Sequence, residues 1–396
     1  FALSEDLPLI AGQMFSSGQK DSAPGAMDDA RPDRWGERII RHIDRPARLS
    51  ILEMLLFAGD DRFGALGIST SAEHYTPRRI GPYPQLRDLE AMVRAVEDVQ
   101  SQVLVTPEIQ RLVQPGVTLG GARPKALLQT DSGPCVIKFS ELDDTVDTPL
   151  IEHATMTLAA LAGIHVASTG VLPIPSWRGR GPQRHALTIQ RFDRVQMGAL
   201  SLRVHCISAK TALAAAGLAE SYGALATVLL RQAHPDRQKA LREELFRRMV
   251  FNILMDNTDD HEKNHALLVV NPHGNGRLKL APAYDVLPSN SGQGYQEFNC
   301  GAQGHDSTLD NAMSECEAFG LSPAEAAEEV VRVIAVVNTW QAHFAKVGVS
   351  AVDIEHLATF IDGDELLRQS RDFESNRYLV AKPRGGKGGR RSPFRP

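Results

Sequence analysis

Residues 257–264 read Asn-Thr-Asp-Asp-His-Glu-Lys-Asn, and they follow a stretch, 237–256, whose apolar residues recur at helical spacing. Four residues separate Asp259 from Asn264. This D-x-x-x-x-N spacing is typical of a protein-kinase catalytic loop, in which the Asp accepts the proton of a substrate hydroxyl and the Asn holds magnesium. The pattern is short and also occurs by chance, so Asp259 could equally be a turn residue at a helix end.

A further carboxylate, Asp285, stands in Ala-Tyr-Asp-Val downstream of this loop. The two β-type runs between them, 266–270 and 277–280, flank the turn sequence Asn-Pro-His-Gly-Asn-Gly and predict a hairpin. Kinases place a second magnesium carboxylate soon after their catalytic loop. The same residue could instead cap a loop, and the spacing alone leaves both interpretations open.

Upstream, short β-type runs predict a small sheet crossed by one helix, 151–162; the runs are 126–129, 135–139, 171–174 and 186–192. Lys138 lies inside the apolar run Val-Ile-Lys-Phe, and a lysine there is costly to bury unless it is paired. Kinases use such a strand lysine to bind nucleotide phosphates. Glu152 is a candidate ion-pair partner. The alternatives are a lysine that faces water at a sheet edge and a glutamate that interacts with the helix dipole.

Two further segments could contact a nucleotide. Residues 118–125 contain the adjacent glycines Gly120 and Gly121, which let backbone N–H groups approach a phosphate closely. They lack the G-x-G-x-x-G and GK[ST] patterns, so a tight turn explains them equally well. Residues 189–194, Ile-Gln-Arg-Phe-Asp-Arg, join the sheet to the helical half, where a two-lobed enzyme would bind adenine. The alternative is a strand end with solvated charges.

The composition restricts the class of protein. A chain of 396 residues with 42% hydrophobic and 23% charged residues predicts two or three packed globular units. The net charge of −5 argues against a dedicated nucleic-acid binder. The four cysteines are scattered, which argues against a disulfide scaffold or a cysteine zinc site and favours a reducing compartment. The longest apolar stretch, 211–230, is interrupted by polar residues and glycines, so we expect no membrane span and a cytoplasmic protein.

We divide the chain into four parts: a flanking region of loop and helices (1–112), a strand-rich lobe (113–192), a helical lobe (193–376) and a basic tail (377–396). The flanking region is predicted to hold helices within 35–57 and 85–112 and a short strand at 62–69. A helix start with a capping serine is predicted at Ser322, and a core helix at 330–344. The tail should be disordered, since it is basic and nearly free of apolar residues.

Together, five segments resemble the HipA family of bacterial serine/threonine kinases, the toxin component of type II toxin–antitoxin pairs; they are 120–128, 136–139, 189–194, 257–264 and 280–289. The resemblance implies an α/β (α+β) fold: a two-lobed, protein-kinase-like structure of the HipA type with a small β-rich N-lobe and a larger helical C-lobe. It also implies a growth-arresting enzyme, linked to persistence, that transfers phosphate from ATP with Mg2+.

Residue by residue, the resemblance implies Asp259 as the catalytic base and Asn264 and Asp285 as the magnesium ligands. The residues that would contact ATP are Lys138, Gly120, Gly121, Ala122 and His261, with backbone groups of Gln190 and Phe192 at the adenine. Thr118 stands where the family has an autophosphorylated serine whose modification switches the enzyme off.

The implied partners are a DNA-binding, HipB-like antitoxin, DNA only through that antitoxin, and a protein substrate in translation such as an aminoacyl-tRNA synthetase. The family's small N-terminal β subdomain is not found ahead of residues 1–10 and is expected either as a separate protein or outside this chain. Two alternatives remain. One is a metal-dependent hydrolase that uses Asp259, Asp260 and His261, and the other is a catalytically silent co-repressor that binds the antitoxin.

Overall fold

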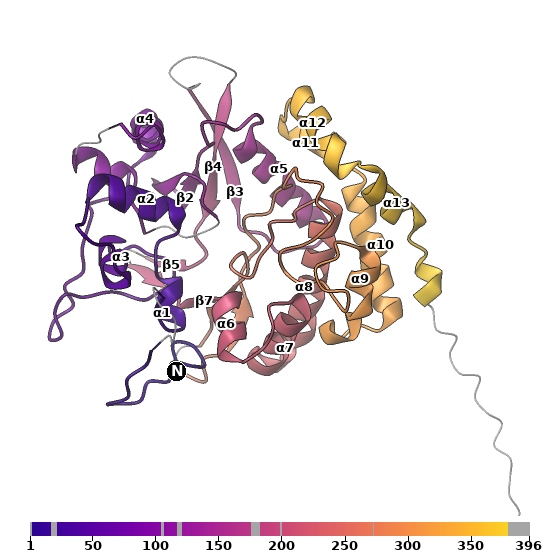
Figure 1. Cartoon of the computed structure of the whole chain (residues 1–396), viewed down its shortest axis with the longest axis horizontal. Helices are drawn as coiled ribbons and strands as arrows, with labels where there is room; N and C mark the ends of the chain where they lie inside the picture. Colours follow the sequence, from indigo (N-terminus) through magenta and orange to yellow (C-terminus); the bar gives the residue numbers. More distant parts are fainter. Residues whose placement is uncertain are drawn as a thin grey trace, which may run out of the picture.

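The computed structural model describes residues 2–16, 22–103, 107–116, 121–175, 183–198, 200–271 and 273–378. One lobe contains a four-stranded sheet and the other is mostly helical; Figure 1 draws the sheet in purple to magenta and most of the helices of the second lobe in red to yellow. None of the described helices is long and apolar enough to cross a membrane. The predicted basic tail falls almost entirely on residues 379–396, which lie outside the described residues.

A four-stranded antiparallel sheet forms the centre of the N-lobe. Its strands are β1 (Lys125–Thr130), β2 (Gly133–Lys138), β3 (Thr169–Ile174) and β4 (Arg184–Gln190), in the order β1-β2-β4-β3. One helix, α5 (Thr148–Leu161), connects β2 to β3 and packs against β3 and β4. The predicted sheet with one crossing helix is thus confirmed. Every residue of β2 is buried, which a central strand covered on both faces requires.

The N-terminal flank covers the outer face of this sheet. It comprises α1 (Ala26–Asp29), α2 (Arg34–Ile43), α3 (Ile51–Phe57), η1 (Leu86–Asp88), α4 (Leu89–Gln100) and η2 (Pro107–Leu112). Trp35 of α2 and Met92 of α4 share an apolar cluster with Leu128 and Ile137 of the sheet. Figure 1 shows α4 on one side of the strands and α5 on the other. The predicted strand at 62–69 is wrong, because these residues form a loop that contacts the other lobe instead of pairing in a sheet.

The C-lobe begins with two small β structures and continues as helices. The strands are β5 (Arg194–Met197), β6 (Leu200–Arg203), β7 (Cys206–Ser208), β8 (Ala266–Val269) and β9 (Leu278–Leu280). β5 pairs with β6, and β7-β8-β9 form a separate antiparallel sheet. The helices are α6 (Ala209–Ala215), α7 (Tyr222–Gln232), α8 (Pro235–Leu254), α9 (Leu309–Ser314), η4 (Cys316–Phe319), α10 (Pro323–Val337), α11 (Trp340–Val347), α12 (Ala351–Ile361), α13 (Asp364–Asp372) and η5 (Ser375–Tyr378).

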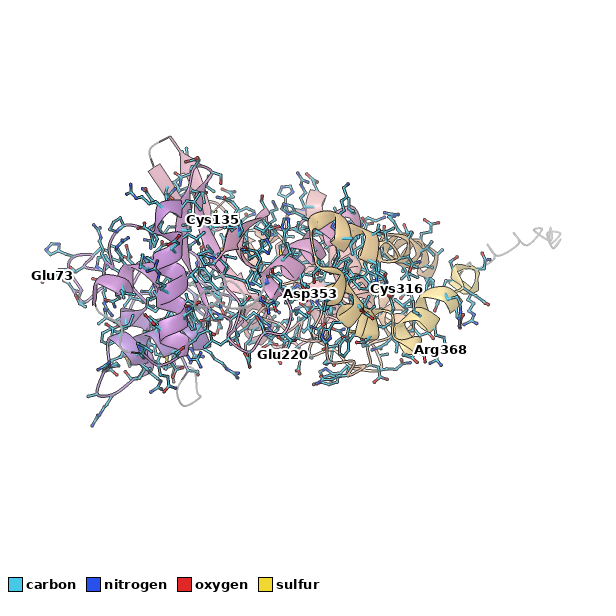
Figure 2. All side chains as sticks on the ribbon, turned by 90° about the horizontal axis from the view of Figure 1, so that it is seen from above. Glu73, Cys135, Glu220, Cys316, Asp353 and Arg368 are labelled. Atoms are coloured by element: carbon cyan, nitrogen blue, oxygen red, sulfur yellow. The ribbon has the colours of Figure 1, made fainter. Side chains whose placement is uncertain are left out.

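Local sequence signals place some of these elements, whereas β5, β6 and β7 were not predicted. β8 and β9 form the predicted hairpin, and Ser322 caps α10 in a reciprocal capping box with Glu325. The predicted helix at 330–344 is instead two helices, because α10 ends at Val337 and α11 starts at Trp340, whose side chain is buried. All four cysteines are free and buried, as expected without disulfides. Figure 2, seen from above, shows Cys135 and Cys316 in different parts of the molecule.

Candidate active site

A buried ion cluster joins three elements from both lobes. Lys138 is the last residue of β2, and its Nζ lies 2.7 Å from Glu152 Oε1 on α5 and 2.6 Å from Asp285 Oδ1 in the segment after β9. Lys138 and Glu152 are only 2% and 1% exposed. The alternative of a lysine that faces water at a sheet edge is therefore wrong. The two carboxylates that the sequence places far apart meet at one ammonium.

The charges in this cluster are unequal, with two carboxylates around one ammonium. Burial by itself would lower the pKa of Lys138, but the charges of Asp285 and Glu152 outweigh it and raise that pKa. Burial raises the pKa of Glu152 more than Lys138 lowers it. Burial also acts upward on Asp285, yet the nearby Lys138 holds the pKa of that carboxyl below its usual range. Asp285 is therefore an ionised carboxylate paired with the Lys138 ammonium.

The backbone at Asp285 is held in an unusual conformation beside the glycine-rich loop. Its φ of 58° lies in the left-handed region, which is uncommon for a residue with a side chain and often marks a functional site. Gly121 also has a positive φ, 49°, and a Cβ built there would lie 3.5 Å from Asp285 Oδ2. The described end of the glycine-rich loop, Gly121 and the exposed Ala122, therefore lies next to this carboxylate. Thr118 and Gly120 lie outside the described residues.

The loop 257–264 follows α8 and is attached to the segment after Asp285. The backbone N–H groups of Thr258 and Asp259 both donate to Ser289 Oγ, at 2.9 and 3.0 Å. Asn264 Nδ2 donates to the backbone oxygen of Asp259 at 3.3 Å, so the two residues of the D-x-x-x-x-N pattern are linked directly. The buried Asn264 Oδ1 has no hydrogen-bond partner among the described residues. A buried acceptor of this kind fits a metal ligand.

Asp259 and Asp260 face opposite surroundings. Asp259 lies at the surface, yet the protein around its carboxyl raises its pKa, first by burial and then through the charges of Asp285 and Glu297, against a lowering effect of His261. Asp260 is buried, where it accepts a hydrogen bond from Tyr222 and lies 2.9 Å from His265 Nε2. Burial acts upward on the pKa of Asp260, but His265 outweighs it and lowers that pKa.

These positions bear on the hydrolase alternative, which needs Asp259, Asp260 and His261 around one metal. Asp260 Oδ2 is already occupied by Tyr222 and His265 inside the C-lobe. In the part of the chain that the structure describes, no group of three or more His, Cys, Asp and Glu side chains could hold a metal ion. The geometry therefore favours a site built on Asp259, Asn264 and Asp285 over the hydrolase cluster.

The segment 189–194, which we call the hinge, joins β4 to β5 at the lobe boundary. The backbone N–H of Gln190 donates to Ser168 O at 2.8 Å, so an adenine contact from Gln190 would use its carbonyl oxygen. The half-buried ring of Phe192 packs against Phe63 and Tyr284. The alternative of solvated charges is wrong, because Arg191, Asp193 and Arg194 are buried. Sequence reasoning missed their partner, the loop 59–64, since its charges resemble those of any surface loop.

Comparisons with known proteins agree with this architecture. The family model described as HipA-like C-terminal domain matches residues 117–340, more than half of the chain. The chain therefore belongs to the HipA family, and its two-lobed α/β fold is the protein-kinase-like fold predicted from the sequence. The flank and the tail lie outside that match. No curated protein matches the chain.

Two solved structures resemble the chain at low sequence identity. One is from the Shewanella oneidensis MR-1 toxin–antitoxin system, a complex of HipA, HipB and operator DNA; the match has 18% identity and a TM-score of 0.63 and covers 96% of this chain and 89% of that chain. The other is the Helicobacter pylori proinflammatory kinase CtkA, with 14% identity and a TM-score of 0.48, covering 66% of this chain and 94% of that chain. The first match shows that the HipA fold extends over nearly the whole chain.

Proposed function

We propose that this chain is an ATP- and Mg2+-dependent serine/threonine protein kinase of the HipA type. The observation that supports this most is the buried Lys138–Glu152–Asp285 cluster, together with the loop of Asp259 and Asn264, whose backbone is bonded to Ser289 in the segment after Asp285. In protein kinases a strand lysine, a helix glutamate and a carboxylate after the catalytic loop occupy these relations. A catalytically silent co-repressor would have no need to bury a lysine and two carboxyl groups at a lobe boundary, where the burial of such groups is costly.

Asp259 is the proposed catalytic base. It is the surface-exposed member of the Asp259–Asp260 pair, so a substrate hydroxyl can reach it. The two hydrogen bonds to Ser289 fix the backbone on which its carboxylate is mounted. Its raised pKa brings the base closer to the working pH, where proton acceptance is most effective.

Asn264 and Asp285 are the proposed magnesium ligands. Both offer oxygen, which Mg2+ prefers, and a kinase site needs only one or two protein ligands besides the phosphates. The unpartnered Asn264 Oδ1 and the ionised Asp285 carboxylate fit this role. When bound, the metal would neutralise the charge of the phosphates. Asp285 would then bind the metal instead of Lys138. The Lys138 ammonium would be free to bind the nucleotide phosphates.

The remaining nucleotide contacts follow from the family. Lys138 would bind the phosphates from β2. The glycine-rich loop would contact the nucleotide through Gly120, Gly121 and Ala122, and the loop 257–264 would contact it through His261. At the hinge, the carbonyl oxygen of Gln190 and the N–H of Phe192 would bind adenine. Gly121 supports this arrangement most directly, because its backbone already lies beside Asp285.

We further propose that the chain acts as a growth-arresting toxin. Its partners would be a DNA-binding, HipB-like antitoxin and a protein substrate in translation, with DNA reached through the antitoxin. The HipA of Shewanella oneidensis, whose fold this chain shares, was solved with HipB and operator DNA. A small N-terminal-subdomain protein is a further expected partner.

Transfer of labelled phosphate from ATP tests the enzymatic activity. We expect wild-type protein to label itself or a translation-factor fraction only with Mg2+ present, and Asp259→Asn to lose about 10²–10⁴ of the rate. Asp260→Asn is the matched control. It should lose about 1–3 kcal/mol of stability because it weakens a buried hydrogen-bonded carboxylate, while keeping most of the rate per folded molecule. Equal loss of rate per folded molecule in both variants would contradict the assignment of Asp259.

Thr118 is the proposed site of self-inactivation. A phosphate there adds about −1.5 to −2 charges to the loop whose described residue Gly121 lies beside Asp285, and repulsion should disfavour the nucleotide-bound loop. Mass spectrometry after incubation with ATP should find phosphate on Thr118 in the wild type and none in Asp259→Asn. The phosphorylated protein should bind ATP much more weakly than Thr118→Ala. Phosphate found only at other residues would refute this role for Thr118.

A further inference from the structure

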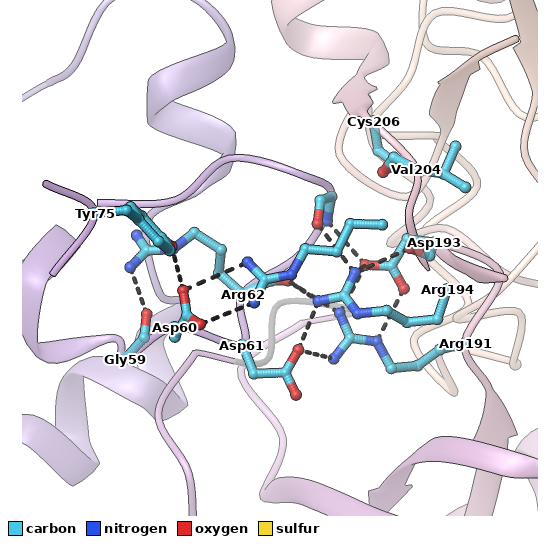
Figure 3. Close-up of polar contacts among 12 residues, drawn as sticks. Gly59, Asp60, Asp61, Arg62, Tyr75, Arg191, Asp193, Arg194, Val204 and Cys206 are labelled. Carbon is cyan, nitrogen blue, oxygen red and sulfur yellow. Dashed lines mark hydrogen bonds and ion pairs between the residues drawn. The ribbon is translucent and has the colours of Figure 1, made fainter. Parts of the chain in front are cut away.

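The loop 59–64 of the N-terminal flank is bonded to the hinge through a buried charge network (Figure 3). Asp61 Oδ1 accepts from both Arg191 Nη1 at 3.0 Å and Arg194 Nη2 at 2.6 Å. The backbone oxygen of Arg62 accepts from the same two guanidinium groups, at 3.0 and 2.8 Å. A segment far away in sequence thus holds both hinge arginines.

Asp193 completes this network from within the hinge. Its carboxylate accepts from Arg191 Nη2 at 2.7 Å and Arg194 Nη1 at 2.8 Å, and Gly64 N donates to it at 2.8 Å. Burial acts upward on the pKa of Asp193, but the two arginines outweigh it and lower that pKa. Hydrogen bonds between two carboxylates and two guanidinium groups therefore fix the side chains of the hinge, and the opposite charges are equal in number.

Aromatic rings continue the connection from this loop to the catalytic centre. The ring of Phe63 meets that of Phe192 edge-on at a centroid distance of 6.0 Å. Phe192 in turn packs on Tyr284 at 5.5 Å, and Tyr284 OH donates to the backbone oxygen of Lys263 at 2.8 Å. Tyr284 directly precedes Asp285. The loop 59–64, the hinge, the segment of Tyr284 and the loop 257–264 are therefore connected through a row of contacting side chains.

We propose that residues 59–64 are a clamp that positions the adenine hinge and the Asp285 segment, with Asp61 and Phe63 as its positioning residues. This inference rests on the proposed nucleotide binding. Neither residue touches the reacting groups. Asp61 sets the direction of the two hinge arginines, and Phe63 sets the tilt of Phe192, whose N–H is the proposed adenine contact. A small displacement of such groups is sufficient to weaken binding strongly.

The neighbouring Asp60 offers a matched control within the same loop. Its carboxylate pairs with Arg203 of β6 at 3.0 Å and accepts from Tyr75, so it serves the β5–β6 hairpin rather than the hinge. Figure 3 shows Asp60 and Asp61 directed to different partners. Substitution of either removes one negative charge at almost the same place.

The experiment measures the affinity for Mg2+–ATP by calorimetry and the separate values of KM and kcat in phosphate transfer. We expect Asp61→Asn to weaken ATP binding and to raise KM for ATP by about tenfold or more, with kcat changed much less. Asp60→Asn should stay within about twofold of the wild type for both. A folded Asp61→Asn protein that binds ATP like the wild type would overturn the clamp.

Substitution of Asp61 leaves two buried arginines with one carboxylate, and the loss of one partner from a buried ion pair can unfold the protein. Phe63→Leu is therefore the second variant, because it keeps an apolar side chain but loses the ring contact with Phe192. We expect it to fold and to raise KM for ATP about threefold or more. An unchanged KM would overturn the clamp while the proposed kinase stands. A folded wild type that binds no ATP would overturn the proposed function and the clamp with it.

Discussion

At the scale of the residue, ionisation in the site is controlled by neighbours that the sequence does not reveal. Asp259 and Asp260 are adjacent, yet the pKa of the first is raised and that of the second is lowered. The difference arises because His265 outweighs the effect of burial on Asp260, whereas burial and then the charges of Asp285 and Glu297 raise the pKa of Asp259. One position in sequence thus separates a catalytic candidate from a structural carboxylate.

The raised pKa of Asp259 predicts the acid limb of the pH profile. A base must be deprotonated, so kcat/KM should fall, as the pH decreases, at a pH above the usual range of an aspartate. Glu297→Gln removes a negative charge that raises this pKa, and should move the limb to lower pH. Rates measured from pH 4 to pH 8 check this. If the acid limb lies at the same pH in the wild type and in Glu297→Gln, the charge of Glu297 does not raise the pKa of Asp259.

At the scale of the element, three pieces of regular structure bring the site together. β2 carries Lys138, α5 carries Glu152, and the hairpin of β8 and β9 leads to Asp285. Each was predicted from local periodicity or turn residues. Their meeting depends on the packing of α5 against the sheet, which only the assembled lobes define. The roles of these residues in binding stay predictions.

Metal dependence tests this arrangement of elements. Mg2+ should strengthen ATP binding to the wild type, and Asp285→Ala should remove that dependence because a ligand is lost. Lys138 keeps its partner Glu152 in this variant, so the fold should survive. Asp143→Ala, which removes an exposed carboxylate between β2 and α5, serves as the control. Calorimetric titrations with and without Mg2+ measure the effect, and metal-independent binding by the wild type would contradict it.

At the scale of the whole molecule, the N-terminal flank packs against both lobes. α2 and α4 cover the sheet, and the loop 59–64 holds the hinge between the lobes. The apolar cluster of Phe63, Leu127 and Leu268 includes residues of the flank and of both lobes. We therefore expect the flank to unfold together with the two lobes.

The basic tail, by contrast, is expected to be dispensable for catalysis. Six basic residues and no acidic one fall in 381–396, a composition that favours disorder and weak contacts with DNA phosphates. A protein that ends at Tyr378 should transfer phosphate at the wild-type rate with an unchanged unfolding temperature. In complex with the proposed antitoxin, the shortened protein should also bind DNA less tightly at low salt than the full chain does. A loss of stability on truncation would refute this expectation.

The sequence by itself determined the strands of the N-lobe sheet, the crossing helix, the hairpin before Asp285, the cap at Ser322 and the family. These features depend on residues close together in the chain, whose periodicity and turn chemistry are local. Only the tertiary structure decided that Asp260 turns inward, that residues 62–69 form no strand, and that the hinge charges are buried. Each of these depends on a distant partner, such as Tyr222, which donates to Asp260, or Asp193, which accepts from Gly64. Local pattern carries no information about such a partner, because burial and pairing energies are set by segments that meet only in the folded chain.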